Sequence, residues 1–426
     1  MENNKYRPRL VDTLLKQYIV TFGAICIEGP KWCGKTWTCE HFASSKFALG
    51  DPMGNFQNRT VAKIDLSIAL GGEPPHLIDE WQEIPELWDA VRYEVDKQGS
   101  SGLFLLTGSS TPKHKGVLHS GAGRIARLRM RTMSLYEAGD STGKISLMSI
   151  AKGNIPAQAT GDVRLQDLAQ FVIKGGWPSR YSLKNQGDAR FFAKEYVKAL
   201  LNEDMNRLED KKRDSRKMKK LLQSLARNES TTASVSTLIS DMREVNGKSL
   251  DDETISDYIG ALSRMFVIDN QPPYSSNVRS SVRIKQAEKL HFTDPSIACA
   301  LLDLNVEKLL NDLKTFGFMF EALCVHDLRI YAEAKGGMLY HYQDYKNREI
   351  DAVVEFEDGK WGAFEIKIGA NQIDSAAESL LKIKKEFEAD SKSNPPSFLC
   401  VICGMSSMAY TRSDGVMVVP ITALRD

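Results

Sequence analysis

The sequence predicts an α/β protein that begins with a parallel β-sheet and ends with a second, smaller α/β unit. Three observations predict this class. Apolar runs at residues 22–27, 76–78 and 102–106 each lead into glycine-rich or polar residues, helical patterns lie between these runs, and residues 349–367 have a hairpin pattern. Apolar runs that alternate with helices are typical of parallel sheets, whereas two strand-like runs around a turn indicate an antiparallel pair.

The first apolar run leads into a loop with the sequence GPKWCGKT, which fits the pattern G-x-x-x-x-G-K-[ST]. Backbone N–H groups and the positive end of the following helix form an anion site in such a loop. We expect Lys35 to reach the outer phosphates of ATP and the Thr36 hydroxyl to hold Mg²⁺. The alternative is a chance match in a turn rich in Gly and Lys. The predicted nucleotide-binding residues are Gly29, Pro30, Lys31, Trp32, Cys33, Gly34, Lys35, Thr36 and Trp37.

The second apolar run ends in two carboxylates, Asp79 and Glu80. As a parallel strand, it would present both acids at its carboxyl end. We expect Asp79 to lie against the Mg²⁺ ion and Glu80 to polarise the water that attacks the terminal phosphate. The alternative is that Asp79 only caps a helical segment at residues 81–96.

The third apolar run ends in Thr107-Gly108-Ser109-Ser110. Ser109 is a candidate for contact with the terminal phosphate or the attacking water, although a hydroxyl-rich turn explains this sequence nearly as well. The glycine-flanked Arg124 is a candidate to stabilise the transferring phosphoryl group from a neighbouring subunit, which requires a homo-oligomer. The arginines that alternate after it predict one solvated strand face (Arg127, Arg129, Arg131).

The middle of the chain predicts helices at residues 189–204, 218–228, 236–245 and 252–265, followed by strand-like pieces at 266–268 and 289–292. This order fits a winged helix-turn-helix. Acids at the third helix oppose contact with DNA phosphates, so we expect a protein-contact or structural module (Asp251, Asp252, Glu253, Asp257). Three cations on the predicted wing favour nucleic acid (Arg279, Arg283, Lys285). The charge run at 207–217 indicates a solvated helix face rather than a phosphate-contacting surface.

The last part of the chain contains a second candidate site. An amphipathic helix is expected to begin at residues 317–321, and a turn at 357–360 joins two predicted strands at 349–354 and 361–367. Strand alternation puts Glu365 and Lys367 on one face, beside which Asp351 could lie. Two carboxylates and a lysine can bind a divalent metal and orient a hydrolytic water. The alternative is a hairpin whose charges face solvent.

The composition of the chain argues against several other classes of protein. A length of 426 residues suggests about three domains, and a net charge of +1 gives no global case for nucleic acid. The seven cysteines are scattered, and Cys400 and Cys403 lie in an apolar run that predicts reduced core residues. The N-terminus has no apolar signal core, and no apolar run approaches the ~20 residues of a membrane span. We therefore expect a cytoplasmic protein without membrane contact.

The order GPKWCGKT, LIDEWQEIPELWDAVRYEVD, LFLLTGSS and GAGRIARLRM resembles AAA-type ATPases of bacteria and archaea that carry a C-terminal domain of unknown function 4143. IKGGWPSR, LLQSLARNES and KLHFTDPSIACALL agree with that second region. Lys31 departs from the family, in which an arginine is more common at this position. The C-terminal spacing looks like the PD-(D/E)xK nuclease fold. That resemblance implies Asp351 and Glu365 as metal ligands, Lys367 as the water-orienting residue and Glu321 as the helix acid, although many such proteins have lost catalysis.

Together these arguments predict a P-loop NTPase domain at residues 1–150, a helical extension at 151–215, a winged-helix module at 216–305 and an α/β nuclease-like domain at 306–426. The expected function is an ATP-hydrolysing switch, with ATP and Mg²⁺ as cofactors, that couples turnover to nucleic-acid binding or metal-dependent cleavage. The alternative is a regulatory or chaperone-like ATPase whose nuclease-like domain is an inactive scaffold for protein partners.

Overall fold

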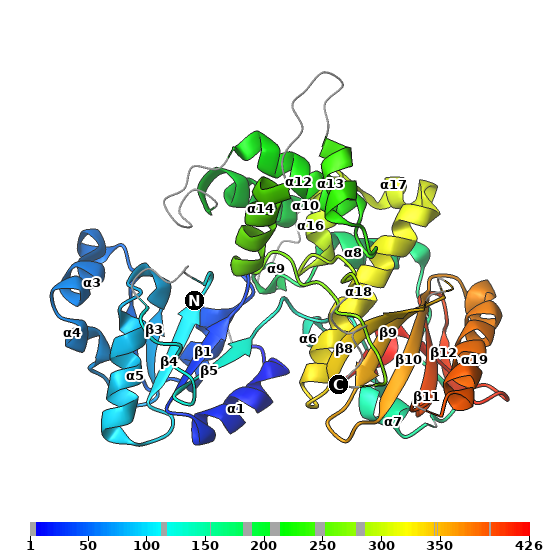
Figure 1. Cartoon of the computed structure of the whole chain (residues 1–426), viewed down its shortest axis with the longest axis horizontal. Coiled ribbons are helices and arrows are strands. Elements are labelled where there is room, and N and C mark those ends of the chain that lie inside the picture. The colour runs from blue at the N-terminus through cyan, green and yellow to red at the C-terminus, as the bar shows by residue number, and fades with distance from the viewer. Residues whose placement is uncertain are drawn as a thin grey trace.

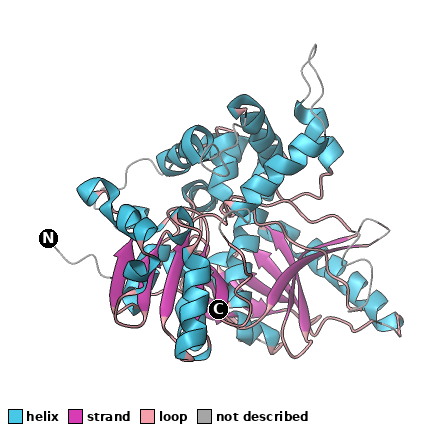
Figure 2. Ribbon diagram, turned by 60° about the vertical axis from the view of Figure 1, so that its left-hand side comes forward, coloured by secondary structure: helices cyan, strands magenta, loops and turns pink. Residues whose placement is uncertain are grey.

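The computed structural model describes residues 6–426 except for 112–116, 154, 182–189, 205–213, 243–251, 278–285, 345, 347 and 392. Two large β-sheets lie on one side of the molecule and a layer of helices lies above them, and a third sheet has only two strands (Figures 1 and 2). The N-terminal sheet has five strands in the order β2-β3-β4-β1-β5. All its pairs are parallel, as predicted, and its strands are β1 (Ala24–Glu28), β2 (Ser45–Ala48), β3 (His76–Asp79), β4 (Phe104–Gly108) and β5 (Ile125–Arg129).

Alternation along β1 assigns the helices to the two faces of this sheet. Ala24 and Cys26 pack in one buried cluster, while Ile25 and Ile27 pack in another. The first cluster includes residues of α4 (Leu66–Leu70) and of the longer helices α3 (Met53–Ile64) and α5 (Leu87–Gln98). The second includes residues of α1 (Val11–Thr21) and α2 (Lys35–Phe42). The sheet is therefore covered by helices on both faces, as parallel sheets usually are.

The C-terminal sheet has seven strands in the order β7-β12-β13-β11-β10-β9-β8. The strands are β7 (Gln158–Ala159), β8 (Met338–Gln343), β9 (Glu349–Glu355), β10 (Trp361–Lys367), β11 (Phe398–Cys403), β12 (Met408–Thr411) and β13 (Met417–Pro420). Strands β9 and β10 form the predicted antiparallel hairpin. Helix α19 (Ile373–Ala389) packs on one face, and its buried residues share a cluster with Val401. The other face contacts α18 (Leu313–Glu333). Cys400 and Cys403 are buried and not disulfide-bonded, as predicted.

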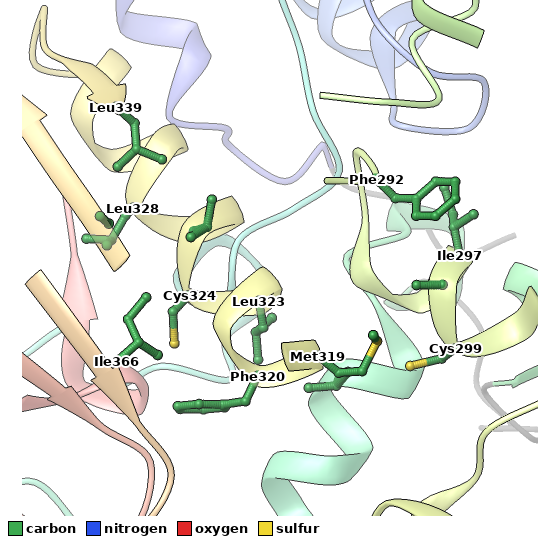
Figure 3. Close-up of a cluster of buried hydrophobic side chains, with 14 of the residues drawn as sticks. Phe292, Ile297, Cys299, Met319, Phe320, Leu323, Cys324, Leu328, Leu339 and Ile366 are labelled. Atoms are coloured by element: carbon green, nitrogen blue, oxygen red, sulfur yellow. The ribbon is translucent and has the colours of Figure 1, made fainter. Parts of the chain in front are cut away.

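A helix is present where one was predicted from Gly317, but the predicted start and the predicted one-sided apolar pattern are wrong. Helix α18 begins at Leu313, where the Asp312 side chain accepts a hydrogen bond from Thr315 N. It is buried on several sides from Phe316 to Ala332, because it lies between the C-terminal sheet and the helical layer. Figure 3 shows Phe320 and Cys324 of this helix near Ile366 of the sheet, and Met319 near Cys299 of the helical layer.

The helical layer contains the four helices predicted for the middle of the chain, which are α10 (Arg190–Ala199) with the π-helix η2 (Leu200–Asp204), α12 (Ser215–Arg227), α13 (Val235–Met242) and α14 (Asp252–Arg264). It also contains α8 (Leu165–Lys174), α9 (Pro178–Tyr181), α16 (Pro295–Leu301) and α17 (Val306–Asn311), which were not predicted individually. Isolated antiparallel bridges join Ile268 to Phe292 and Gln271 to Lys289. The predicted wing cations and most of the charge run lie outside the described residues (Arg279, Arg283, Lys285, 207–213).

The predicted domain limits at 150, 215 and 305 do not coincide with breaks in the hydrophobic core. A single buried cluster extends from Leu135 to Leu424. Strand β6 (Ile145–Ser146) pairs with β14 (Leu424–Arg425), and β7 pairs with β12, so β6 and β7 belong to the C-terminal sheets, whereas the prediction placed β6 in the P-loop domain and β7 in the helical extension. The remaining elements are α6 (Leu135–Ala138), α7 (Leu147–Ala151), η1 (Trp81–Glu83), η3 (Ala370–Gln372) and η4 (Ile421–Ala423).

Candidate nucleotide-binding site and C-terminal carboxylate cluster

The glycine-rich loop connects the end of β1 to the start of α2. Gly34 precedes the helix with φ 102°, a left-handed conformation that favours glycine. At Gly29 a Cβ atom would lie 2.0 Å from the carbonyl oxygen of Met130, so a side chain cannot fit there. The buried ammonium group of Lys35 folds back over the loop and donates to the carbonyl oxygens of Gly29 (2.9 Å) and Pro30 (2.8 Å). The loop therefore has the strand–loop–helix context that the phosphate-binding pattern requires.

Asp79 lies at the end of β3, beside the first turn of α2. Its Oδ1 atom accepts hydrogen bonds from the hydroxyl groups of Thr36 (2.9 Å) and Thr107 (2.6 Å). Its Oδ2 atom lies 3.4 Å from Nζ of Lys46 on β2. The alternative of a helix cap does not account for these contacts. The topology therefore brings Thr36 and Asp79 together, as predicted, whereas no local pattern had singled out Lys46.

Glu80 follows directly after β3 and has φ 60° and ψ 49°. A left-handed conformation is uncommon for a residue with a side chain and is frequent at functional sites. Its backbone N–H donates to the Thr107 hydroxyl (2.9 Å), and its Oε2 atom accepts a hydrogen bond from Ser109 Oγ (3.0 Å) and another from Gln82 Nε2. The two predicted catalytic residues Glu80 and Ser109 thus contact each other at the carboxyl ends of β3 and β4.

Arg124 does not lie near the loop of its own chain. It precedes β5, and its neighbour Ile125 pairs with Ala24 at the start of β1, whereas the loop follows the end of β1. Its Nε atom lies 2.7 Å from Oδ1 of Asp96. A role for Arg124 in ATP hydrolysis therefore needs a second chain, as expected from the sequence, and stays a prediction.

The prediction of a solvated arginine face holds for Arg127, which is exposed, and is wrong for Arg131, which is buried just after β5. The Arg127 guanidinium pairs with Glu28 and lies 4.4 Å from the centre of the Trp88 ring. The Arg131 side chain is only 7% exposed, and it pairs with Asp269 (2.5 Å) and Glu333 (2.5 Å) from the C-terminal half of the chain. Arg131 is buried because its partners come from the C-terminal half of the chain, whereas the partners of Arg127 belong to β1 and α5 of the N-terminal unit.

Two contacts with other elements of the chain hold the glycine-rich loop in place, and no sequence pattern indicated them. The buried Arg9 donates to the carbonyl oxygen of Cys33 (2.9 Å) and pairs with Glu137 (3.0 Å). Burial alone would raise the pKa of Glu137, but Arg9 and two backbone N–H groups lower this pKa below its ordinary value. Trp32 has φ 66°, and its ring contacts that of Tyr196 on α10 with centroids 5.8 Å apart. Trp37, on the first turn of α2, is 46% exposed.

The C-terminal candidate residues also lie together. Phe364 pairs with Ala352, which places Glu365 beside Asp351. Lys367 Nζ lies 2.8 Å from Oε2 of Glu365 and 3.4 Å from Oδ2 of Asp351. The alternative of solvent-facing charges is wrong for the two acids, because Glu365 is 5% and Asp351 7% exposed.

Burial and neighbouring charges shift the pKa values of these carboxyl groups. Burial and the neighbouring Asp351 carboxylate together raise the pKa of Glu365 to about 8, against the opposing effect of Lys367. Burial raises the pKa of Glu321 on α18 to about 7, against the effect of Lys289, which lies 2.7 Å away. The pKa of Asp351 is lowered in spite of burial, because Lys367 and Lys289 favour its charged form.

Within the described ranges, no group of three or more His, Cys, Asp or Glu side chains is arranged to hold a metal ion. The carboxylates of the C-terminal cluster have lysine partners instead (Lys367, Lys289).

Comparison with protein families assigns three regions of the chain. Residues 21–139 match the model of an AAA domain, and residues 316–424 match that of a domain of unknown function 4143. The chain carries an AAA domain and a domain of unknown function 4143. This confirms the resemblance inferred from the sequence, and the AAA domain implies nucleotide binding. Residues 165–308, between these two domains, match a domain of unknown function 8612.

Relatives of the whole chain are distant. Uncharacterized proteins of Mycobacterium tuberculosis and Mycobacterium bovis are each 22% identical over 347 residues, which cover 80% of this chain and 70% of theirs. A solved structure, the Walker-type ATPase PABY2304 of Pyrococcus abyssi, is 13% identical with a TM-score of 0.40 and covers 70% of this chain and 99% of that chain. Among the described helices, none is long and apolar enough to cross a membrane.

Proposed function

We propose that the AAA domain binds ATP together with Mg²⁺ and hydrolyses it. The observation that carries this proposal is the position of Asp79 and Glu80 at the end of β3, where Asp79 accepts a hydrogen bond from Thr36 of the glycine-rich loop (2.9 Å). Carboxylate and hydroxyl oxygens suit Mg²⁺, so Thr36 and Asp79 would hold this ion. When bound, Mg²⁺ would neutralise part of the phosphate charge.

The protein groups around this position have separate roles in the proposal. Lys35 would exchange the carbonyl oxygens of Gly29 and Pro30 for phosphate oxygens, which are stronger partners for an ammonium group. Glu80 would accept a proton from the attacking water. Ser109 would hold the Glu80 carboxylate through the 3.0 Å hydrogen bond, so that its orientation is set before ATP arrives.

Two substitutions test this proposal. Lys35→Ala should abolish tight ATP binding, because the phosphates lose their main cationic partner. Glu80→Gln should keep ATP binding and slow hydrolysis about 10²–10⁴-fold, because it preserves shape and removes the base. Glu83→Gln is a matched control, since Glu83 lies on η1 and pairs with Arg59 (2.9 Å). Binding is measured by calorimetry and turnover by phosphate release. Equal turnover in the wild type and Glu80→Gln would exclude the role of Glu80.

We further propose that the AAA domain acts on the C-terminal half of the chain through ion pairs that cross between them. Arg131, just after β5, pairs with Asp269 and with Glu333 of α18, both at 2.5 Å. An element that contacts both a nucleotide site and a second domain can transmit a change of state between them. These contacts support a switch, the class of function predicted from the sequence.

For the C-terminal half, the sequence suggested metal-dependent nucleic-acid cleavage or an inactive scaffold for protein partners. The carboxylates Glu365 and Asp351 are buried and paired with Lys367. The nuclease-like pattern includes Lys367 itself, so this pairing fits both alternatives. The additional buried cation Lys289, 2.7 Å from Glu321, favours the scaffold, because a second positive charge opposes metal binding where water is largely excluded.

A further inference from the structure

The buried side chain of Arg9 connects the glycine-rich loop to two other segments of the chain. Its Nη1 atom donates to the carbonyl oxygen of Cys33 in the loop (2.9 Å), and its Nη2 atom donates to the carbonyl oxygen of Arg131 after β5 (3.0 Å). Its Nε atom donates to Oε1 of Glu137 on α6 (3.0 Å). Each nitrogen of the planar guanidinium group therefore has a partner on a different segment, which fixes the orientation of the group.

The carboxylate that compensates the Arg9 charge is fixed as well. The Glu137 side chain also accepts hydrogen bonds from the backbone N–H groups of Leu10 (2.8 Å) and Ser134 (2.8 Å). A buried guanidinium group is costly unless a carboxylate compensates its charge. The contact between Arg9 and Cys33 thus belongs to a network that consists of protein groups only, and it needs no nucleotide to form.

The bond from Arg9 sets the direction of the peptide group between Cys33 and Gly34. This peptide bond is trans, and in a trans peptide the C=O and N–H groups point in opposite directions. The Cys33 carbonyl oxygen points toward Arg9, so the Gly34 N–H points away from it. Backbone N–H groups of such a loop are the groups that hold phosphates. Arg9 itself is only 8% exposed, so it acts from behind the loop and not on the nucleotide.

We propose that Arg9 is a positioning residue for phosphate binding, which holds the Cys33–Gly34 peptide with its N–H directed at the phosphates. Such preorganisation lowers the cost of ordering the loop when the nucleotide binds. Arg9 therefore sets the affinity for the nucleotide and not the rate of hydrolysis, since the groups proposed for hydrolysis, Glu80 and Ser109, lie after β3 and β4. This inference rests on the proposed ATP binding.

Calorimetry with ATP and ADP, beside phosphate release at saturating ATP, tests this inference on the full chain. Arg9→Lys keeps a positive charge for Glu137, but one ammonium nitrogen cannot replace the three guanidinium nitrogens. The Kd for ATP should rise about 10- to 100-fold, the equivalent of one hydrogen bond from a charged donor, and kcat should stay at the wild-type value. The Kd for ADP should rise by the same factor, because the loop N–H groups hold phosphates that both nucleotides carry.

A second variant avoids an uncompensated buried charge. Arg9→Met/Glu137→Gln removes both charges together and leaves the Cys33 carbonyl oxygen without its donor, so it should lose affinity as Arg9→Lys does. Lys289→Gln is the control for stability, because it removes a buried cation from the C-terminal half (4% exposed) and should leave both Kd values unchanged. Thermal unfolding shows how much stability each variant loses.

Three results would overturn the proposal. They are wild-type affinity in the Arg9 variants, a loss of affinity in Lys289→Gln that matches theirs, and a loss confined to ATP or accompanied by an equal fall in kcat. A wild-type chain that binds ATP while the Arg9 variants bind it equally well removes only the role of Arg9. A wild-type chain that binds neither nucleotide removes the proposed function and this inference together.

Discussion

Asp269 joins the two halves of the molecule, and its substitution by asparagine should destabilise the fold strongly. Its carboxylate lies 2.5 Å from Nε of Arg131, 2.8 Å from Nη1 of Arg329 and 3.8 Å from Nη2 of Arg129. The Arg131 and Arg329 side chains are each 7% exposed. Asp269→Asn keeps the shape of the side chain and removes the one charge that these guanidinium groups share.

The expected loss follows from the burial of the partners. Removal of one partner from a buried ion pair costs about 3–5 kcal/mol, because the other charge stays buried without compensation. Arg131 keeps Glu333 as a partner, which places Asp269→Asn toward the lower value, about 3 kcal/mol. Asp167→Asn is the control, since its partner Arg164 is 77% exposed and an exposed pair contributes about 0–1 kcal/mol.

The dependence of this loss on pH has a definite sign. Burial would raise the pKa of Asp269, but Arg131, Arg329 and Arg129 hold it well below its ordinary value. A group whose pKa is lowered in the folded state stabilises the fold fully above its unfolded pKa of about 3.9, and this contribution falls as the pH drops toward the folded pKa. The gap between wild type and Asp269→Asn should therefore be constant from neutral pH to about pH 5 and should narrow below about pH 4.

Urea unfolding followed by circular dichroism measures the free energy of unfolding of the wild type and both variants. A loss in Asp269→Asn as small as that in Asp167→Asn would refute the reasoning. So would a gap that stays constant between pH 5 and pH 3.

Two further predictions concern the candidate sites. Arg124→Ala should lower ATP turnover without weakening ATP binding. Mixing the Arg124→Ala protein with the Lys35→Ala protein should restore some activity. The control is Arg92→Ala, which removes another partner of Asp96 (2.9 Å). Turnover per chain that does not depend on protein concentration would argue against a role across subunits. In a cleavage assay on single- and double-stranded DNA and RNA with Mg²⁺, Mn²⁺ and ATP, we expect no cleavage by the wild type, in line with the scaffold role. Cleavage that Glu365→Ala abolishes, with ATP hydrolysis intact, would establish the nuclease instead.

Local patterns predicted the parts of the structure that depend on nearby residues. The strands before the glycine-rich loop, before Asp79 and before Ser109 are short apolar runs with clear ends, and each is a strand of the parallel sheet. The β9–β10 hairpin needs only its turn and its alternation. The burial of α18 on several sides could not be predicted in this way, because such a helix lacks the one-sided apolar pattern of a surface helix.

Contacts between distant segments could not be read from the sequence. Arg9 reaches Cys33, and Lys289 reaches Glu321, only because the fold brings separate elements together. The sequence around a single lysine or arginine does not show which residue it will pair with. Most lysines and arginines are exposed to solvent, so a buried one cannot be recognised in advance. The predicted limit at residue 150 failed to match a break in the core for the same reason: β6 and β7 are too short to be recognised before their partner strands are known.

The pairing of β6 with β14 has a consequence for the order of folding during synthesis. Residues 21–139, which match the AAA domain, leave the ribosome before any of the second sheet, and they contain the strands β1 to β5 of a complete parallel sheet. Strand β6 at residues 145–146 must then wait for residues 424–425 before it gains its neighbour. N-terminal domains generally fold first as the chain emerges. The nucleotide site can therefore form while the C-terminal half is still being made, and β6 is an unpaired strand edge during that interval.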